Sequence, residues 1–348
     1  MAQRITVNAP DGSYDIVIEP GLLQDRDRML EHMGISGRAC VVTNRTLAPL
    51  YGEALTGLLP DAALVTMPDG EQYKTLETVA QLYSDLIAAR LDRAGTVIAL
   101  GGGVVGDTAG FAAATYLRGV RLVQVPTSLM AMVDSSVGGK VGVDLPQGKN
   151  LVGAFKQPDV VLIDPQVLQT LPVKEWRCGM AEVIKHGLLA DPLLLEQVIQ
   201  SDSAPEELIR RAVQVKVDVV EQDPYERNIR AHLNLGHTFA HAIEQVTHYQ
   251  WAHGEAVGVG LLAAANLSYA LGLCAADLPE QVQEYLSHIG LPCALGGLDP
   301  EALYAAMATD KKWQGGHSYF VLLRGVGEPC IIRNVPKETV TTVLQQLQ

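Results

Sequence analysis

The chain has 348 residues, of which 48% are hydrophobic, and this is enough for the cores of two domains. Its 39 acidic and 26 basic residues give a net charge of −13, which disfavours nucleic acid or an anionic membrane surface as a partner, because both select for clustered positive charge. The five cysteines are scattered, so neither a disulfide framework nor a thiolate zinc site is predicted. The first residues contain no apolar signal-peptide core, and we expect a cytoplasmic protein.

The first half of the chain alternates short β-branched runs with amphipathic stretches. The runs predicted as strands cover residues 39–43, 64–67, 96–100, 122–125 and 160–163. Strands and helices that alternate at this spacing predict a parallel sheet covered by helices. We therefore expect an α/β N-terminal domain with a Rossmann-like parallel sheet over residues 1–172.

Helical periodicity replaces the strand pattern after Pro172. The predicted helices cover residues 206–221, 238–246, 254–271 and 336–347. The stretch 256–274 is apolar enough to raise the question of a membrane span, but it contains Asn266 and Ser268 and is rich in glycine and alanine, so we interpret it as a buried helix. An all-α C-terminal domain is predicted over residues 173–348.

A glycine-rich turn follows the strand predicted at residues 96–100 and opens a helix predicted at residues 104–116. Gly101, Gly103 and Gly106 satisfy the pattern Gly-x-Gly-x-x-Gly, whose glycines let the backbone approach a pyrophosphate seated on helix N-terminal amides. The pattern is weak on its own. It indicates either a dinucleotide site or a tight strand-to-helix turn without a ligand.

The rest of a dinucleotide fingerprint is missing. An acidic residue that binds a ribose is expected about 20 residues further on, but residues 123–127 read Val-Gln-Val-Pro-Thr. If a dinucleotide binds, its ribose and adenine must therefore be held elsewhere. The candidates are Asn44, which follows a predicted strand, and the turn at residues 69–74.

One glutamate and three histidines form a candidate metal set. His237 and His241 are four residues apart and so share one face of a helix, while His253 precedes the next predicted helix and can fold back beside them. Glu182 adds a carboxylate, and two imidazoles with one carboxylate are typical of catalytic zinc. A single histidine on a helix is more often an ordinary polar residue, and spacing alone leaves open which three groups bind the metal.

The chain also holds polar, cationic segments that suit an anionic substrate. Glycine-rich loops are predicted at residues 134–140 and 148–153. Further cations in the second half are Lys185, Lys216, Arg230, Lys311 and Lys312. Any one of these is better interpreted as a solvated surface charge. As a set that converges on a metal, they would hold a phosphate or a carboxylate.

These motifs together resemble the 3-dehydroquinate synthase family, a sugar phosphate cyclase family, over essentially the whole chain. The matching blocks, in family order, are residues 101–107, 126–129, 134–140, 148–150, 180–186 and 234–244. The resemblance implies an architecture shared with the glycerol dehydrogenases, in which an α/β NAD-binding domain is joined to an α-helical domain that binds metal and substrate.

The resemblance implies a role for individual positions. Glu182, His237 and His253 match the ligands of Zn²⁺ or Co²⁺, which assigns His241 to the substrate. Positions that match substrate contacts are Asp134, Lys140, Asn150, Lys185, Lys216, Arg230, Asn234 and His241. Positions that match NAD contacts are Asn44, Glu71, Lys74, Gly102, Gly103, Asp107, Thr127, Ser128, Lys140 and Thr170. Either Lys311 or Lys312 matches a further basic contact.

The implied reaction converts 3-deoxy-D-arabino-heptulosonate 7-phosphate to 3-dehydroquinate and phosphate. It runs through NAD-mediated oxidation, β-elimination of phosphate, reduction, ring opening and aldol closure, so NAD is regenerated in each turnover. Arg118 has two interpretations: a cation that complements a helix C-terminus, or, as in the resembling enzymes, a residue that reaches the substrate site of its partner in a homodimer.

Other functions remain open at this point. Another sugar phosphate cyclase, such as a deoxy-inosose or valiolone synthase, would use the same metal and cofactor, but Asn234 and His241 favour dehydroquinate synthase. A metal-dependent alcohol dehydrogenase of a neutral polyol does not explain the number of basic groups. A catalytically inactive binding protein would be expected to have lost part of the set Glu182, His237 and His253, and all three are present.

Overall fold

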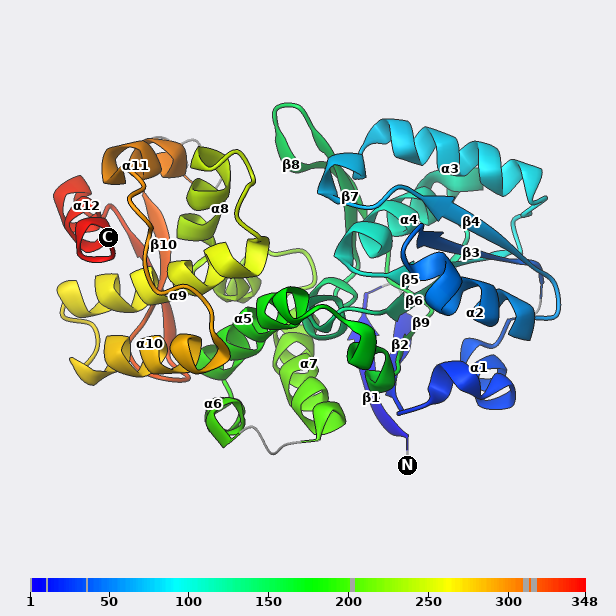
Figure 1. The fold of residues 1–348 in the computed structure, drawn as a ribbon, viewed down its shortest axis with the longest axis horizontal. Helices are drawn as coiled ribbons and strands as arrows, with labels where there is room; N and C mark the ends of the chain where they lie inside the picture. Colours follow the sequence, from blue (N-terminus) through cyan, green and yellow to red (C-terminus); the bar gives the residue numbers. More distant parts are fainter. Residues whose placement is uncertain (1, 11, 36, 201–203, 309–312, 314–317) are drawn as a thin grey trace. The chain divides into compact units, whose positions relative to one another are not determined.

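A computed structural model describes residues 2–348 except 11, 36, 201–203, 309–312 and 314–317 (Figure 1). The chain divides into two compact units, Met1–Pro172 and Val173–Gln348. Each unit has its own core of buried hydrophobic side chains. None of the helices in the described residues is long and apolar enough to cross a membrane.

The N-terminal unit is built on a seven-stranded sheet with the order β1-β2-β9-β6-β5-β3-β4. Its strands are β1 (Gln3–Ala9), β2 (Gly12–Ile18), β3 (Ala39–Asn44), β4 (Ala62–Met67), β5 (Thr96–Gly101), β6 (Arg121–Pro126) and β9 (Val160–Ile163). The predicted strands are confirmed as β3, β4, β5, β6 and β9. The sheet is mixed, however, because β1 pairs antiparallel with β2, and neither strand was predicted.

Helices cover both faces of this sheet. They are α1 (Arg26–Met33), α2 (Glu53–Leu58), α3 (Leu76–Ala88) and α4 (Gly103–Thr115). Figure 1 shows α3 and α4 on one side of the sheet and α1 and α2 on the other. Short helical turns complete the connections: η1 (Leu22–Gln24), η2 (Ala48–Gly52), η3 (Glu71–Tyr73), η4 (Tyr116–Arg118), η5 (Ala131–Ser135) and η6 (Pro165–Thr170).

A hairpin replaces the glycine-rich loop that was expected at residues 148–153, whereas only Lys140 of the loop expected at residues 134–140 lies in a strand. β7 (Lys140–Leu145) pairs antiparallel with β8 (Gly148–Phe155) in a separate two-stranded sheet. Two glycines permit close packing here. A Cβ on Gly153 of β8 would lie 2.5 Å from the Val141 carbonyl oxygen of β7, and a Cβ on Gly110 of α4 would lie 2.5 Å from Val141 Cγ1. The prediction of a loop at residues 148–153 was wrong because Gly153 allows β8 to pack closely on β7.

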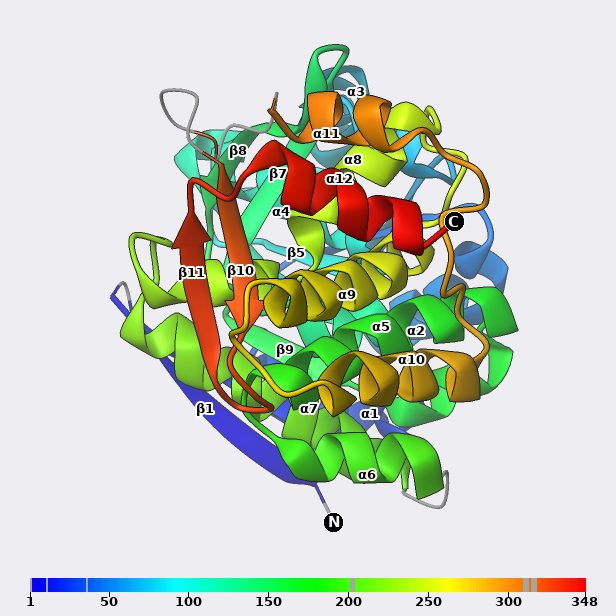
Figure 2. The same ribbon diagram turned by 90° about the vertical axis from the view of Figure 1, so that its left-hand side faces the viewer.

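The C-terminal unit is mostly helical, with α9 at its centre (Figure 2). Its helices are α5 (Val173–Leu189), α6 (Pro192–Gln200), α7 (Pro205–Gln222), η7 (Ile229–Asn234), α8 (His237–Val246), α9 (His253–Ala270), α10 (Asp277–Ile289), α11 (Pro300–Ala308) and α12 (Lys337–Gln346). The predicted helices are confirmed as α7, α8, α9 and α12. The apolar stretch around residue 260 lies in α9, where nearly every side chain is buried.

The expectation of an all-α C-terminal domain was wrong in one element. β10 (Tyr319–Leu323) and β11 (Pro329–Arg333) form an antiparallel hairpin beside α9 (Figure 2). In its register Leu323 lies opposite Pro329. The Leu323 N–H donates to Ser268 Oγ of α9 at 3.0 Å. The same hydroxyl donates to the Ala264 carbonyl at 2.7 Å, so Ser268 connects β10 to α9.

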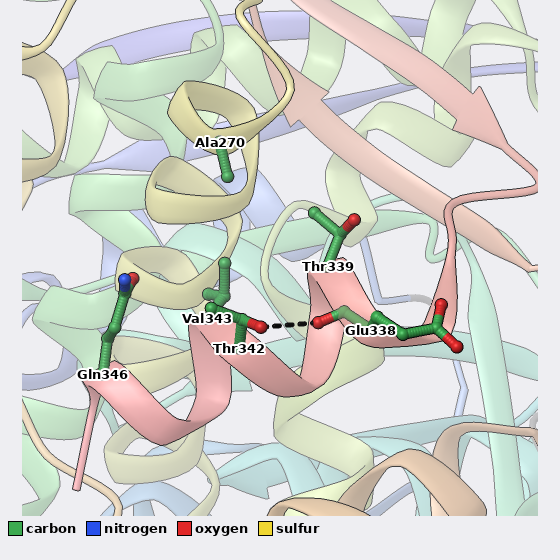
Figure 3. Close-up of a pocket in the computed structure, with 6 residues that line it drawn as sticks. All are labelled: Ala270, Glu338, Thr339, Thr342, Val343 and Gln346. Atoms are coloured by element: carbon green, nitrogen blue, oxygen red, sulfur yellow. Dashed lines mark hydrogen bonds between the residues drawn. The ribbon is translucent and has the colours of Figure 1, made fainter.

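Replacing Ser268 with alanine is expected to lower the free energy of unfolding by about 1–3 kcal/mol, because it leaves a buried N–H of β10 without an acceptor. Urea unfolding measures the change. Thr342→Ala is the matched control, since that exposed hydroxyl donates only to Glu338 of its own helix, at the edge of a shallow groove between α9 and α12 (Figure 3). Equal stability of the two variants would contradict the assigned role of Ser268.

Candidate active site

The glycine turn lies at the carboxyl end of β5, an interior strand of the N-terminal sheet. The N-cap of α4 is Gly102, which has no side chain to cap the first amides of the helix. A Cβ on Gly102 would lie 3.4 Å from Ser128 Oγ, and a Cβ on Gly103 would lie 3.1 Å from Ser135 Oγ. Helix N-terminal amides without a side-chain cap can bind a pyrophosphate, and the absence of side chains on Gly102 and Gly103 lets such a group come close. The residues present are therefore compatible with a dinucleotide.

Half of the ten predicted NAD positions lie at this edge of the sheet. Because β3, β5, β6 and β9 are parallel, their carboxyl ends meet at one edge, where α/β proteins bind ligands. Asn44 is the last residue of β3, and the predicted positions that directly follow β5 and β6 are Gly102, Gly103, Thr127 and Ser128. Thr170 ends η6, and its hydroxyl lies 2.6 Å from the hydroxyl of Tyr51, which follows β3.

Lys74 has contacts that sequence reasoning did not predict. Its ammonium donates to Asp107 Oδ2 and to Asn150 Oδ1, both at 2.6 Å, and its side chain is only 5% exposed. Burial would lower the pKa of Lys74, but the charges of Asp107 and Glu71 raise it above its ordinary value. Lys74 and Asp107, which are both predicted cofactor positions, are therefore linked to Asn150, a predicted substrate position. Nearby, Glu71 Oε1 lies 3.7 Å from Lys149 Nζ.

The hairpin separates two of the predicted substrate residues. Lys140 is the first residue of β7 and pairs with Phe155, whereas Asn150 lies near the turn, with its N–H donating to Asp144 Oδ1. Lys140 and Asn150 are both exposed. Asp134 lies in η5, which follows β6.

Arg118 is an exposed residue of η4, after α4 has ended. Leu117, Arg118 and Gly119 have φ values of 51°, 70° and 114°, so three successive residues adopt left-handed conformations. Such a backbone is costly outside glycine. Arg118 is the basic residue of the last turn of η4, directly after α4, and both interpretations of Arg118 stay predictions.

The C-terminal unit brings Glu182, His237 and His253 together, with ligand atoms within 4.8 Å of one another. Glu182 Oε1 lies 3.6 Å from His237 Nε2 and 3.7 Å from His253 Nε2. Tetrahedral zinc with bonds of about 2.1 Å separates two ligand atoms by about 3.4 Å. The donor set and its spacing therefore fit a divalent ion such as Zn²⁺ or Co²⁺.

His241 does not belong to this group. It lies one turn further along α8 than His237, its side chain is exposed, and the two ring centroids are 5.7 Å apart. The position agrees with the assignment of His241 to a substrate, which stays a prediction.

Two close helix contacts bring the three groups together. A Cβ on Gly254 would lie 2.2 Å from Cys178 Cα, so the N-terminus of α9 packs directly on the backbone of α5 and places His253 beside Glu182. A Cβ on Gly260 would lie 2.3 Å from the carbonyl oxygen of Gly236, the left-handed N-cap of α8. This second contact places His237, the first residue of α8.

The charges around Glu182 are paired within the unit. Glu182 is fully buried in α5, and its Oε2 forms an ion pair with Lys185 one turn later, while Oε1 faces the two imidazoles. Burial and the Lys185 charge hold the pKa of His237 well below its ordinary value. Burial would also lower the pKa of His253, but hydrogen bonds to Glu182 and Glu244 raise it to about 9.

The other predicted substrate residues of this unit lie in α7 and η7. Lys216 is buried in α7, and Arg230 is buried in η7. Asn234 ends η7 and donates to Glu226 Oε1 at 2.9 Å. Asp223 accepts hydrogen bonds from three backbone amides, including that of Arg230, and so fixes the turn that presents η7. Lys311 and Lys312 lie outside the described residues.

Sequence reasoning missed the carboxylates that support these groups. Asp223 and Glu226 hold η7, and Glu244 binds His253. A signal existed for Glu244, which is seven residues after His237 and so shares its helix face. No comparable periodicity marks Asp223 or Glu226, because they lie in irregular chain.

Family models match most of the chain. A model of the 3-dehydroquinate synthase N-terminal region matches residues 64–178, and one of the C-terminal region matches residues 179–313. The 3-dehydroquinate synthase of Nostoc punctiforme is 43% identical over 361 residues, with 99% of each chain covered. That of Halorhodospira halophila is 46% identical over 347 residues, covering 97% of this chain and 98% of the relative.

The chain belongs to the 3-dehydroquinate synthase family. The family indicated by the sequence motifs is thereby confirmed. Solved structures of other sugar phosphate cyclases share the family fold. 2-Epi-5-epi-valiolone synthase from Streptomyces hygroscopicus subsp. jinggangensis, with NAD⁺ and Zn²⁺ bound, is 28% identical, has a TM-score of 0.89 and covers 96% of both chains.

Two further structures extend the comparison. A 2-deoxy-scyllo-inosose synthase complexed with carbaglucose-6-phosphate, NAD⁺ and Co²⁺ is 26% identical, with a TM-score of 0.88, and the match covers 99% of this chain and 100% of that one. A probable glycerol dehydrogenase from Sinorhizobium meliloti has a TM-score of 0.64 at 15% identity and covers 95% of both chains, so it shows a shared fold alone. The expected fold class is confirmed, with the β1–β2 pair and the β10–β11 hairpin as additions.

Metal binding to the metal-free protein is expected to release about one proton per ion near pH 7, because His253 has a pKa of about 9 and must be neutral to coordinate. Affinity should therefore rise about tenfold per pH unit until His253 is neutral, and level off above that. Calorimetry in buffers of different ionisation enthalpy measures the released protons. An affinity that does not change between about pH 6 and pH 8 would contradict this assignment.

Proposed function

We propose that this member of the family is a 3-dehydroquinate synthase, a phosphate lyase that forms a carbocycle from 3-deoxy-D-arabino-heptulosonate 7-phosphate in the shikimate pathway to aromatic amino acids. The observation that carries the proposal is full-length identity of 42–46% to 3-dehydroquinate synthases. The two solved cyclases of other substrates described above are 26–28% identical. The intact set of Glu182, His237 and His253 supports an active enzyme.

The two units are assigned different tasks. We assign residues 1–172 to NAD, with the pyrophosphate on the Gly102 and Gly103 amides. Residues 173–348 hold the metal through Glu182, His237 and His253. When bound, NAD supplies a hydride acceptor and donor, and the divalent ion supplies a Lewis acid that lowers the pKa of substrate hydroxyls.

The chain's own residues bind and orient the anionic substrate. Lys216 and Arg230 are both buried, where water screens electrostatic attraction less, so they suit the carboxylate end and the hydroxyls of the substrate. Asn150 and His241 carry exposed donors suited to the phosphate, and Lys140 adds a cation from the other end of the hairpin. The proton lost during elimination is assigned to the substrate's own phosphate, and Asp134, Lys185 and Asn234 complete the predicted contacts.

We also propose a cytoplasmic homodimer. All five cysteines are free thiols, which fits a reducing compartment. Arg118 is exposed on a strained turn, where its side chain is available to a second copy of the chain. The partners are thus a small phosphorylated sugar acid and a second subunit, with no nucleic acid and no membrane.

Product analysis tests the proposed function. Purified protein with NAD, a divalent metal and the heptulosonate phosphate should release phosphate and 3-dehydroquinate in equal amounts, with NAD needed only in catalytic quantity. NADH should not accumulate, because the cycle is redox-neutral. Steady growth of NADH absorbance in step with turnover would favour an alcohol dehydrogenase. Absence of phosphate release would contradict the proposed function.

Subunit complementation tests the shared site. Arg118→Ala and Lys216→Ala should each be inactive alone, whereas a mixture after subunit exchange should recover activity, because each mixed dimer holds one site with both native residues. Rates of phosphate release measure the recovery, and a mixture of two separately prepared Lys216→Ala samples is the control. No recovery after verified exchange would place Arg118 in its own subunit's site or outside the site.

A further inference from the structure

Glu244 is a buried carboxylate for which the proposed reaction has no use. It is 2% exposed and lies on α8, two helical turns after His237 and on the same face. A carboxylate at that depth is costly unless hydrogen bonds and positive charge compensate it. Its Oε1 lies 3.3 Å from Nδ1 of His253.

The chemistry of this contact decides which nitrogen of His253 can bind a metal. An ionised carboxylate has acceptors only, so the hydrogen of the contact lies on Nδ1. In a neutral imidazole the lone pair is then on Nε2. Nε2 is the atom that faces Glu182 Oε1 at 3.7 Å, inside the candidate metal set.

The second imidazole of the set is arranged in the same way. His237 Nδ1 lies 3.1 Å from the carbonyl oxygen of Leu235, another group that only accepts. Its Nε2 faces the same oxygen of Glu182 at 3.6 Å. Both histidines are thus held by acceptors behind Nδ1, but only the support of His253 comes from a side chain that can be replaced.

We propose that Glu244 is a positioning residue that fixes the ring orientation and the tautomer of His253 for metal binding. The inference rests on the proposed metal site and adds a role for a residue outside the ligand set. The anionic partner also makes the imidazole a stronger donor, and loss of such partners typically weakens metal binding about 10–100-fold.

Metal affinity of single variants tests the inference. Glu244→Gln should bind Zn²⁺ about 10-fold more weakly, because its amide offers Nδ1 only a neutral oxygen, and Glu244→Ala should bind it up to about 100-fold more weakly. Competition with a chelating dye measures both constants. Glu255→Gln is the matched control: it removes a carboxylate close to His253, but its amide oxygen can still accept from the Ala252 N–H, so affinity should stay within about twofold.

A readout of the His253 ring separates positioning from general loss of structure. In zinc-loaded protein with ¹⁵N-labelled histidine, the wild type should show a protected Nδ1–H of His253, and Glu244→Ala should lose that protection. In Co²⁺-loaded protein the visible absorption should shift in Glu244→Ala and not in Glu255→Gln. If Glu244→Ala fails to fold, the isosteric Glu244→Gln decides.

Wild-type affinity in both Glu244 variants, with an unchanged ring signal, would overturn the inference, as would a wild type that binds no divalent metal. These outcomes differ from failure of the proposed function. That failure would appear as metal binding that depends on Glu244 in a protein that releases no phosphate from the heptulosonate substrate.

Discussion

The C-terminal unit depends on how closely the α9 backbone approaches α5 and α8. Both approaches occur at glycines, Gly254 against Cys178 and Gly260 against Gly236, and a single methyl group at either would overlap backbone atoms. The contacts fix three helix segments around one buried oxygen of Glu182. A buried carboxylate is costly unless it is compensated, and this one faces Lys185 on one side and two imidazoles on the other, where a divalent ion would complete the compensation.

In the proposed function, the N-terminal unit must hold anions in a chain with a net charge of −13. Its glycine turn offers backbone amides in place of cationic side chains. The buried ammonium group of Lys74 is paired with the carboxylate of Asp107. The same lysine binds Asn150 of the β7–β8 hairpin. Predicted cofactor and substrate positions are therefore linked by direct hydrogen bonds within one unit.

The parts of the fold that the sequence predicted are those with a strong local pattern. The strands β3, β5 and β6 could be placed because burial on both faces gives a short continuous apolar run. Helix α8 could be placed because burial on one face imposes a helical period, and α9 because its apolar stretch is too long for a strand. The β7–β8 hairpin was missed because its glycines look like loop residues, whereas Gly142 and Gly153 allow the backbones of the two strands to approach closely. Asp223 and Glu226 were missed because hydrogen bonds of irregular chain leave no period. The motifs gave the family, but the contact between Lys74 and Asn150, 76 residues apart, required coordinates.

Glu182, His237 and His253 are proposed to form one metal site. The most direct measurement is a crystal of the protein loaded with Zn²⁺, with an anomalous difference map collected at the zinc absorption edge. We predict a single strong peak about 2.0–2.2 Å from a Glu182 oxygen and from Nε2 of both histidines, with Glu244 still bound to Nδ1 of His253. A peak coordinated by His241 in place of His253, or no peak beside Glu182, would contradict the account.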